Sequence, residues 1–358
     1  MSGPTIVIAA GGTAGHVVPA LAVADALRAE ARARVVFIGG ERAEAQLVPE
    51  AGYELRQVQV AGLSRTDPVK AARAGVRAVG AVGACARLLG ELRPAAVLGG
   101  GGYVAGVAGA AAVARRVPLV LTEADSHMGI ANRLLSPFAR RICLAFPIAG
   151  RDGERYRVTG RPVPGARADR HAARTRFGIG DDETCVLVFG GSLGARSVNE
   201  AAVAGLAGAP YRVLHAAGRR DHAALADALG PEPPANYLLH DYITPFGDAL
   251  AAADLVVARA GGSIFEVASY ARPAILVPYP HAAGDHQAAN ARWMAEAGAA
   301  VVIADGELSA QRLRREVDAL LADPTRLLAM GAASGALARP YAARDIAREV
   351  LRAAGASA

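Results

Sequence analysis

Two short glycine-rich segments, one in each half of the chain, have residue types and spacing suited to binding a phosphate or another oxyanion. The first follows the apolar residues 5–10 and contains Gly11, Gly12, Thr13, Gly15 and His16. The second follows residues 185–189 and contains Gly190, Gly191, Ser192 and Gly194. Each apolar run predicts a buried parallel strand, and the segment after it predicts a helix whose N-terminal N–H groups can bind an anion. Neither segment has the glycine spacing of a dinucleotide fingerprint, which argues against a nicotinamide-dependent dehydrogenase.

Further polar residues in the first half follow predicted strands. His16 begins the first predicted helix, and an imidazole can accept a proton at neutral pH, although a histidine that only caps or packs the helix is the alternative. Residues 99–102 are four glycines followed by Tyr103. Glu123 ends another strand, with Asn132 shortly after it. Because carboxyl ends of parallel strands share one sheet edge, these groups are expected close to the first glycine segment.

The second half repeats this arrangement. Arg259 ends a predicted strand, and Glu266 lies at the start of the following helix. A carboxylate there can accept hydrogen bonds from ribose hydroxyls or complement the helix dipole. Gln287 follows the next strand and is expected to bind sugar hydroxyls. The acidic residues 181–183 precede a strand instead of ending one, so no metal between nucleotide phosphates is predicted.

Strand and helix patterns alternate through both halves, which predicts an α/β protein with two Rossmann-like domains whose parallel sheets face a central cleft. Residues 1–161 form the first predicted domain and residues 162–340 the second. A final helix, within residues 341–358, is expected to pack back on the first domain. Residues 156–170 are rich in proline, glycine and charge, and predict a linker between the domains.

Composition excludes several classes of protein. With 358 residues, of which 53% are hydrophobic, the chain can form two cores. The three cysteines lack metal-ligand spacing, and no cofactor is predicted. The net charge of +6 favours anionic partners, but only 5% of residues are aromatic and no nucleic-acid motif is present, so nucleic acid is not an expected partner. No segment predicts a membrane span or a signal peptide, which favours a cytoplasmic protein.

Seven motifs in one order resemble the MurG family of peptidoglycan N-acetylglucosaminyltransferases. They are GGTAGHVVPALAVADAL, GGGGYVAG, TEADSHMGIANRLL, VTGRPV, GGSLGARSVNE, RAGGSIFE and DHQAANA. The resemblance implies a GT-B fold and metal-independent, inverting transfer of N-acetylglucosamine from UDP-N-acetylglucosamine (UDP-GlcNAc). The implied acceptor is the muramic acid 4-hydroxyl of lipid I, a lipid linked through undecaprenyl diphosphate, and the product is lipid II.

The same resemblance implies a role for each matching residue. The catalytic residues would be His16, as the base, and Glu123. The acceptor-binding residues would be Gly11, Gly12, Thr13, Gly15, Tyr103 and Asn132. The residues binding UDP-GlcNAc would be Arg161, Gly191, Ser192, Gly194, Ile243, Glu266 and Gln287. Among these, the glycine segment with Ser192 would hold the diphosphate, Ile243 the uracil, Glu266 the ribose and Gln287 the sugar.

The chain departs from the family pattern at several positions. The family's His-Glu-Gln-Asn stretch is Thr-Glu-Ala-Asp at residues 122–125, so only Glu123 is retained. Arg161 stands at the family's asparagine, and Pro164 at an arginine expected near the donor phosphates. Ala288 replaces the second of two glutamines. The donor class is therefore the firmer inference, and the acceptor the weaker one.

Residues 69–92 predict a basic, apolar helix that carries Lys70, Arg73 and Arg77 and is suited to the inner leaflet of the cytoplasmic membrane, although an amphipathic core helix is the alternative. Together with the resemblance, this helix predicts a peripheral protein on the cytoplasmic face of the cell membrane. Three other functions stay open: a GT-B glycosyltransferase with another lipid or metabolite acceptor, a UDP-GlcNAc 2-epimerase, and a nucleotide-sugar binding protein without activity.

Overall fold

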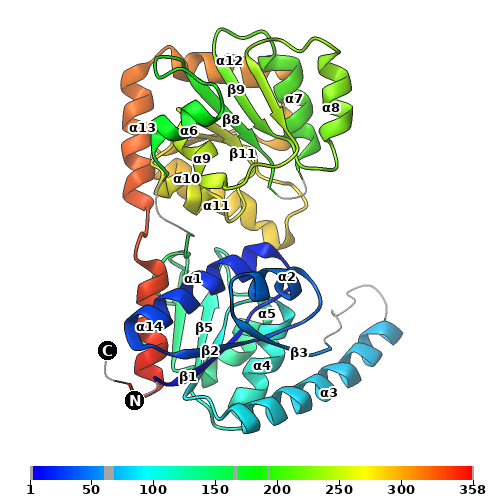
Figure 1. The fold of residues 1–358 in the computed structure, drawn as a ribbon, viewed down its shortest axis with the longest axis vertical. Helices are drawn as coiled ribbons and strands as arrows, with labels where there is room; N and C mark the ends of the chain where they lie inside the picture. The colour runs from blue at the N-terminus through cyan, green and yellow to red at the C-terminus, as the bar shows by residue number, and fades with distance from the viewer. Residues whose placement is uncertain (1–2, 60–67, 164–167, 192–193, 357–358) are drawn as a thin grey trace. The chain divides into compact units, whose positions relative to one another are not determined.

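The computed structural model describes residues 3–59, 68–163, 168–191 and 194–356, with the backbone only for residues 68–78 and 283. The chain divides into two compact units: Met1–Pro164 with Arg339–Ala358, and Gly165–Ala338. Each unit has one parallel sheet with helices on both faces (Figure 1), which confirms the predicted α/β fold class with two Rossmann-like units. The shared cleft and the division of acceptor and donor between the units stay predictions.

The sheet of the first unit has the strand order β3-β2-β1-β4-β5-β6-β7, and all its pairs are parallel. Its strands are β1 (Thr5–Ala9), β2 (Arg34–Gly39), β3 (Glu54–Gln57), β4 (Ala96–Gly99), β5 (Leu119–Glu123), β6 (Arg141–Leu144) and β7 (Tyr156–Val158). Its helices are α1 (Ala14–Ala31), α2 (Ala43–Glu50), α3 (Pro68–Leu92), α4 (Gly102–Ala114), α5 (Ile130–Leu135), the 3-10 helix η1 (Ser136–Phe138) and α14 (Ala342–Ala353).

Alternation along β1 separates the two apolar cores of this unit. Ile6 and Ile8 pack with α1, α2 and α14 on one face, while Val7 and Ala9 pack with α3, α4 and α5 on the other. Successive side chains of a strand point to opposite faces, so a strand covered on both sides must be apolar throughout. The polar side chains of the inner strands therefore lie at the strand ends, as those of Arg34, Glu123 and Arg141 do.

The last helix belongs to the first unit. Figure 1 shows α14 beside α1. Ile346 and Val350 are buried against α1 and the sheet, at 1% and 0% exposure. Glu349 accepts a hydrogen bond from Nε of Arg141 on β6 at 3.0 Å, which ties the helix to a strand far away in the sequence.

The sheet of the second unit has the order β10-β9-β8-β11-β12-β13, and it too is parallel throughout. Its strands are β8 (Cys185–Phe189), β9 (Arg212–Ala216), β10 (Tyr237–His240), β11 (Leu255–Ala258), β12 (Ala274–Leu276) and β13 (Ala300–Val302). Its helices are α6 (Arg170–Arg176), α7 (Arg196–Leu206), α8 (His222–Leu229), α9 (Phe246–Ala252), α10 (Ile264–Ser269), η2 (Ala283–Asp285), α11 (His286–Glu296), η3 (Asp305–Glu307), α12 (Ala310–Leu321) and α13 (Pro324–Leu337).

The predicted linker is wrong in its first part. Tyr156–Val158 form β7, the last strand of the first sheet, which pairs with β6. Three residues with a proline soon after them have no detectable periodicity, and the strand exists because β6 offers it an edge. The alternating pattern also left β6, α5, α6 and α13 without a prediction.

Among the described residues, no helix is long and apolar enough to cross a membrane. Ser192 and Pro164, which the sequence singled out, lie outside the described residues. The side chains of Lys70, Arg73 and Arg77 lie outside the described part as well, although the backbone confirms a helix, α3, where the basic apolar helix was predicted.

Packing of α14 should contribute strongly to the stability of the first unit. We expect Ile346→Ala to cost about 2–5 kcal/mol, because it removes a buried side chain and leaves a cavity between α14 and the sheet. The lower Tm should be measurable by calorimetry. Leu328→Ala on α13 is the control, since Leu328 is 76% exposed and its loss should change stability by less than about 0.5 kcal/mol. Equal effects of the two substitutions would contradict this packing.

Candidate active site

The first glycine segment connects β1 to α1 and carries the candidate base. Thr13 is the N-cap of α1, and its carbonyl accepts hydrogen bonds from the N–H groups of His16 and Val17. The hydroxyl of Thr13 lies 3.3 Å from Nδ1 of His16. His16 is therefore oriented by the turn that starts its own helix, with its imidazole half-buried.

Glu44, which the sequence analysis missed, holds this segment in place. Its carboxylate is 1% exposed and accepts hydrogen bonds from the N–H groups of Gly12 and Gly40, both at 2.8 Å. One buried carboxylate thus joins the loops after β1 and β2. The N–H of Gly12 is occupied by this bond, so an anion at this loop must be bound by other groups. A glutamate in the first turn of α2, directly after a strand that ends in glycines, was the available signal.

The glycines after β4 lie against the first segment, as predicted from the shared sheet edge. Gly101 has a φ of +105°, and a Cβ atom built on it would lie 2.5 Å from Cδ2 of His16. Only glycine allows this approach, so the β4 loop forms one wall beside the imidazole. Tyr103 lines a groove of about 1180 Å³ together with Gly11, Thr13, His16 and Glu44.

Glu123 and Asn132 are brought together at the end of β5. Glu123 is 6% exposed, and its carboxylate accepts hydrogen bonds from the N–H groups of Asp125 and Gly129 and from Nδ2 of Asn132, at 3.2, 2.8 and 2.9 Å. Nδ2 of Asn132 also donates to the carbonyl of Thr122. Burial raises the pKa of Glu123, and these hydrogen bonds oppose the rise. Since its oxygens are engaged by the β5–α5 loop, the geometry favours a positioning role for Glu123.

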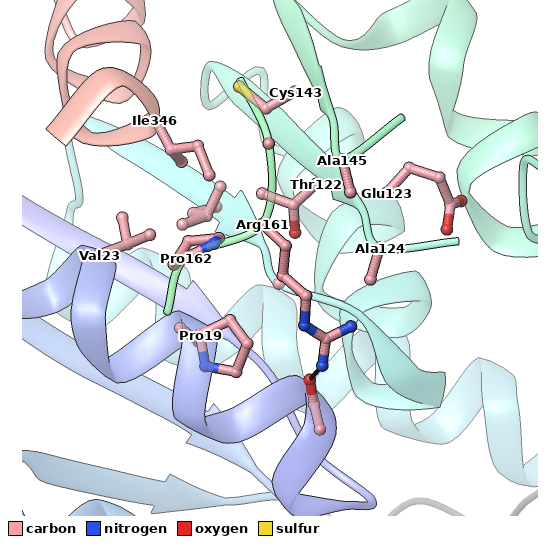
Figure 2. A pocket seen from close by; sticks show the side chains of 15 residues that line it. Pro19, Val23, Thr122, Glu123, Ala124, Cys143, Ala145, Arg161, Pro162 and Ile346 are labelled. Carbon is pink, nitrogen blue, oxygen red and sulfur yellow. Dashed lines mark hydrogen bonds between the residues drawn. The ribbon is translucent and has the colours of Figure 1, made fainter. Parts of the chain in front are cut away.

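Arg161 lies in the first unit, beside α1. Nη2 of Arg161 donates to the carbonyl of Gly15 at 2.5 Å, the dashed line in Figure 2. Arg161, Pro19 and Glu123 are among the residues that line a small cavity of about 30 Å³, shown in Figure 2. The arginine that replaces the family's asparagine therefore contacts the loop that carries His16.

The charges around His16 act in opposite directions on its pKa. Burial lowers the pKa, and the positive charge of Arg161 lowers it further, while the carboxylates of Asp125 and Glu44 raise it. The net shift is downward from 6.5. The imidazole is therefore neutral at pH 7 and is able to accept a proton.

The described predicted residues of the second unit lie in the loops after its strands or in the first turns of the helices that follow. Gly191 and Gly194 follow β8, both with positive φ. Ile243 lies after β10 and is 4% exposed. Glu266 is the third residue of α10. Gln287 lies at the start of α11, and its Oε1 accepts a hydrogen bond from the N–H of Tyr279 at 2.9 Å.

Arg259 joins several of these loops and is 8% exposed. Its Nη1 lies 2.6 Å from the carboxylate of Asp305 and donates to the carbonyl of Val277 after β12 at 3.1 Å. Its Nη2 donates to Oγ of Ser197 on α7 at 2.8 Å. Ser197 in turn donates to Asp305 at 2.7 Å. The sequence pointed to Arg259 but gave no sign of Asp305 or Ser197, because the three are far apart in the chain.

The opposing charges predict opposite shifts for two matched variants. We expect Arg161→Gln to raise the pKa of His16, because it removes a positive charge that disfavours the imidazolium, and Asp125→Asn to lower it, because it removes a negative charge that favours it. An NMR titration of the His16 ring protons measures both shifts. His171 in the second unit, with 76% of its side chain exposed, is the internal control. Shifts of the same sign in the two variants would contradict the arrangement.

Comparisons with known proteins follow the division into units. The model described as "Glycosyltransferase family 28 N-terminal domain" matches residues 6–144, and "Glycosyltransferase family 28 C-terminal domain" matches residues 185–348. A UDP-N-acetylglucosamine–N-acetylmuramyl-(pentapeptide) pyrophosphoryl-undecaprenol N-acetylglucosamine transferase of Moorella thermoacetica is 40% identical, over 97% of this chain and 98% of the relative.

Solved structures agree with these matches. The crystal structure of MurG from Acinetobacter baumannii is 28% identical with a TM-score of 0.77, over 97% of this chain and 99% of that one. A UDP-N-acetylglucosamine 2-epimerase shares the fold alone, with 13% identity and a TM-score of 0.69 over 99% of this chain and 97% of that one. The chain belongs to glycosyltransferase family 28 and, within it, to the MurG family of N-acetylglucosaminyltransferases.

Proposed function

We propose that this protein transfers N-acetylglucosamine from UDP-GlcNAc to the muramic acid 4-hydroxyl of lipid I, with inversion, to give lipid II. The observation that carries this proposal is the identity of 40% to a transferase of that name along nearly the whole of both chains. The arrangement of the first glycine segment supports it, because a half-buried neutral imidazole lies in a groove large enough for a sugar.

His16 is the general base in the proposed mechanism. The acceptor 4-hydroxyl attacks the anomeric carbon of the donor sugar and gives its proton to the imidazole, while the bond from that carbon to the diphosphate breaks and UDP leaves. For Nε2 to receive the proton, the hydrogen of the neutral ring must be on Nδ1, where the hydroxyl oxygen of Thr13 can accept it. The lowered pKa favours the neutral ring over the imidazolium at neutral pH.

The remaining residues of the first unit would bind or position the acceptor. Gly11, Gly12 and Gly15 would shape the loop. The N–H groups of Ala14 and Gly15, which precede the first hydrogen bonds of α1, would donate to the acceptor diphosphate. Tyr103 lines the groove beside them. Glu123 and Asn132 hold the β5–α5 loop, which borders the same region.

Donor binding is assigned to the second unit. Gly191, Ser192 and Gly194 would bind the diphosphate at the start of α7, where a helix N-terminus stabilises the negative charge of the leaving group. Ile243 would contact the uracil, Glu266 would accept hydrogen bonds from the ribose hydroxyls, and Gln287 would bind the sugar. The resemblance also assigns Arg161 to the donor, and its positive charge would suit the donor diphosphate.

Replacement of the base tests the mechanism. We expect His16→Asn to lower kcat about 10²–10⁴-fold, with donor binding unchanged. The measurement is UDP release from labelled UDP-GlcNAc, with and without a lipid I analogue. His171→Asn, at an exposed position of the second unit, is the control.

The same assay separates the alternatives. A kcat close to that of the unchanged protein would remove His16 as the base. Epimerisation without acceptor would support an isomerase, and donor binding with neither reaction would support a binding protein. UDP release with another lipid or metabolite, but not with a lipid I analogue, would identify that compound as the acceptor in place of lipid I.

A lipid acceptor requires contact with the membrane, and we place this contact at an apolar stripe on α5 and η1. Ile130, Leu134 and Phe138 follow one another at four-residue spacing and are 67%, 70% and 62% exposed. The exposed Arg133 and Arg140 flank them. Large apolar side chains beside basic ones suit the interface of an anionic leaflet. The peripheral location at the inner leaflet of the cytoplasmic membrane rests on this surface and on α3, where Val79 is 74% exposed.

Vesicle binding tests the stripe. Replacing Ile130, Leu134 and Phe138 together by serine should abolish sedimentation with vesicles that contain phosphatidylglycerol, because each buried apolar chain contributes about 1.5–3 kcal/mol. Leu328→Ser, on an exposed face of α13, is the matched control. Catalysis with a water-soluble acceptor should persist in the triple variant. Undiminished binding by this variant would refute the stripe and leave α3 as the candidate.

A further inference from the structure

A chain of four buried polar side chains crosses the apolar core of the second unit. Tyr237 on β10, His215 on β9, Asn199 on α7 and Asp221 before α8 are 4%, 0%, 0% and 6% exposed. The hydroxyl of Tyr237 lies 2.8 Å from Nδ1 of His215, and Nε2 of His215 lies 3.1 Å from Oδ1 of Asn199. Nδ2 of Asn199 donates to Asp221 at 3.1 Å. Buried polar groups of this kind require full hydrogen bonding, so the chain has one arrangement of donors and acceptors.

The acceptors at the Asp221 end of this series of hydrogen-bonded side chains determine the orientation of Asn199. Its amide faces the carbonyl of Ala217, at 2.9 Å, as well as the carboxylate of Asp221. Both groups can only accept hydrogen bonds, so the NH₂ group of Asn199 must point toward them. Its carbonyl oxygen then points toward His215.

The orientation of Asn199 in turn sets the state of His215. An acceptor opposite Nε2 requires the hydrogen to be on Nε2, which leaves Nδ1 to accept from the hydroxyl of Tyr237. Burial lowers the pKa of His215 to about 3. The ring is therefore neutral throughout the physiological range and does not act as a pH switch. Every hydrogen bond in the chain is donated in one direction, from Tyr237 toward Asp221.

The chain ends against the second glycine segment. Gly194 has a φ of +76°, and a Cβ atom built on it would lie 2.4 Å from the carbonyl oxygen of Ala217 and 3.3 Å from Oδ2 of Asp221. The two groups that Asn199 holds are thus the two against which Gly194 packs. Arg220 also donates to both oxygens of Asp221, at 2.9 and 3.0 Å. A shift of Ala217 or Asp221 would therefore move the backbone of Gly194.

We propose that His215 is a positioning residue of the donor site: through Asn199 it holds Ala217 and Asp221 against Gly194, and so fixes the backbone of Gly194 in the loop assigned to the donor diphosphate. This inference rests on the proposed function, which assigns the diphosphate to that loop. His215 itself has no contact with solvent, so it touches no substrate. If His215 only made hydrogen bonds within the core, its substitution would lower the stability of the protein and leave its affinity for UDP-GlcNAc unchanged.

Substitution of His215 in the full-length protein distinguishes a role in positioning Gly194 from a role in stability alone. His215→Phe keeps a buried aromatic ring but leaves Oδ1 of Asn199 without its hydrogen-bond donor, so Asn199 can reorient. We expect the KM for UDP-GlcNAc and the Kd for UDP to rise about three- to thirtyfold, with a smaller change in kcat. His215→Gln, which places an amide donor near the position of Nε2, should restore most of the donor affinity.

Tyr211→Phe is the matched control. Tyr211 is a buried tyrosine of the same core whose hydroxyl donates to Asp318 on α12 at 3.0 Å, away from the glycine segment. Its loss should lower Tm without changing the donor KM. If His215→Phe lowers Tm in the same way and leaves the donor KM unchanged, the positioning role is overturned.

Two further measurements keep the outcome decisive. If His215→Phe does not fold, Asn199→Ser removes the same amide contact to Ala217 and Asp221, and it should raise the donor KM as well. ¹⁵N NMR of the unchanged protein should show His215 protonated at Nε2, with no titration between about pH 5 and 8. Titration in that range would contradict the arrangement of hydrogen bonds from Tyr237 to Asp221. Failure of the unchanged protein to bind UDP would count against the proposed function instead.

Discussion

Hydrogen bonds from buried side chains to neighbouring strand-ending loops are the constraint on which both units depend. Each sheet is parallel and covered on both faces, so its strands are apolar and the polar groups collect in the loops at the strands' carboxyl ends. The backbone groups of these loops need partners when they are buried. Glu44, Glu123, Asn199 and Arg259 supply them, each from a different part of the chain.

In the two units, side chains of opposite charge make hydrogen bonds to the backbone of these loops. In the first, the carboxylates of Glu44 and Glu123 accept hydrogen bonds from loop N–H groups. These carboxylates reduce the capacity of the loops to bind a phosphate, and Glu44 also raises the pKa of His16. Arg161 restores a positive charge at the same place. In the second unit Arg259 donates instead to the loop carbonyls of Val277 and Pro278.

Much of the fold was predictable from the sequence because its signals are local. A buried strand is an apolar run, a glycine segment marks the turn after it, and parallel strands bring such turns to one edge. β7 was missed because three residues carry no period. Helix α13 was missed because Gly331, Ser334 and Gly335 weaken its pattern, although Asp323 as N-cap and Pro324 after it were available signals.

The side chains that hold the site were less predictable. Glu44, Ser197 and Asp305 have roles that exist only after distant segments have folded together. Glu123 and Asn132 were found by their place at a strand end, but their mutual hydrogen bond, and hence a positioning role, was not visible in the sequence. Sequence patterns therefore identify which loops form the site, while the structure identifies which side chains support those loops.

Two histidines illustrate why a shifted pKa alone does not identify a base. Burial lowers the pKa of both His16 and His215 and keeps both neutral. His215 has a partner at each nitrogen inside the core, so no position is left for a proton from a substrate. His16 has Thr13 near Nδ1 and lines a large groove. A histidine that can transfer a proton has one ring nitrogen open to the groove and the other held by a neighbour. A histidine that fixes the shape of a loop has both nitrogens engaged inside the core.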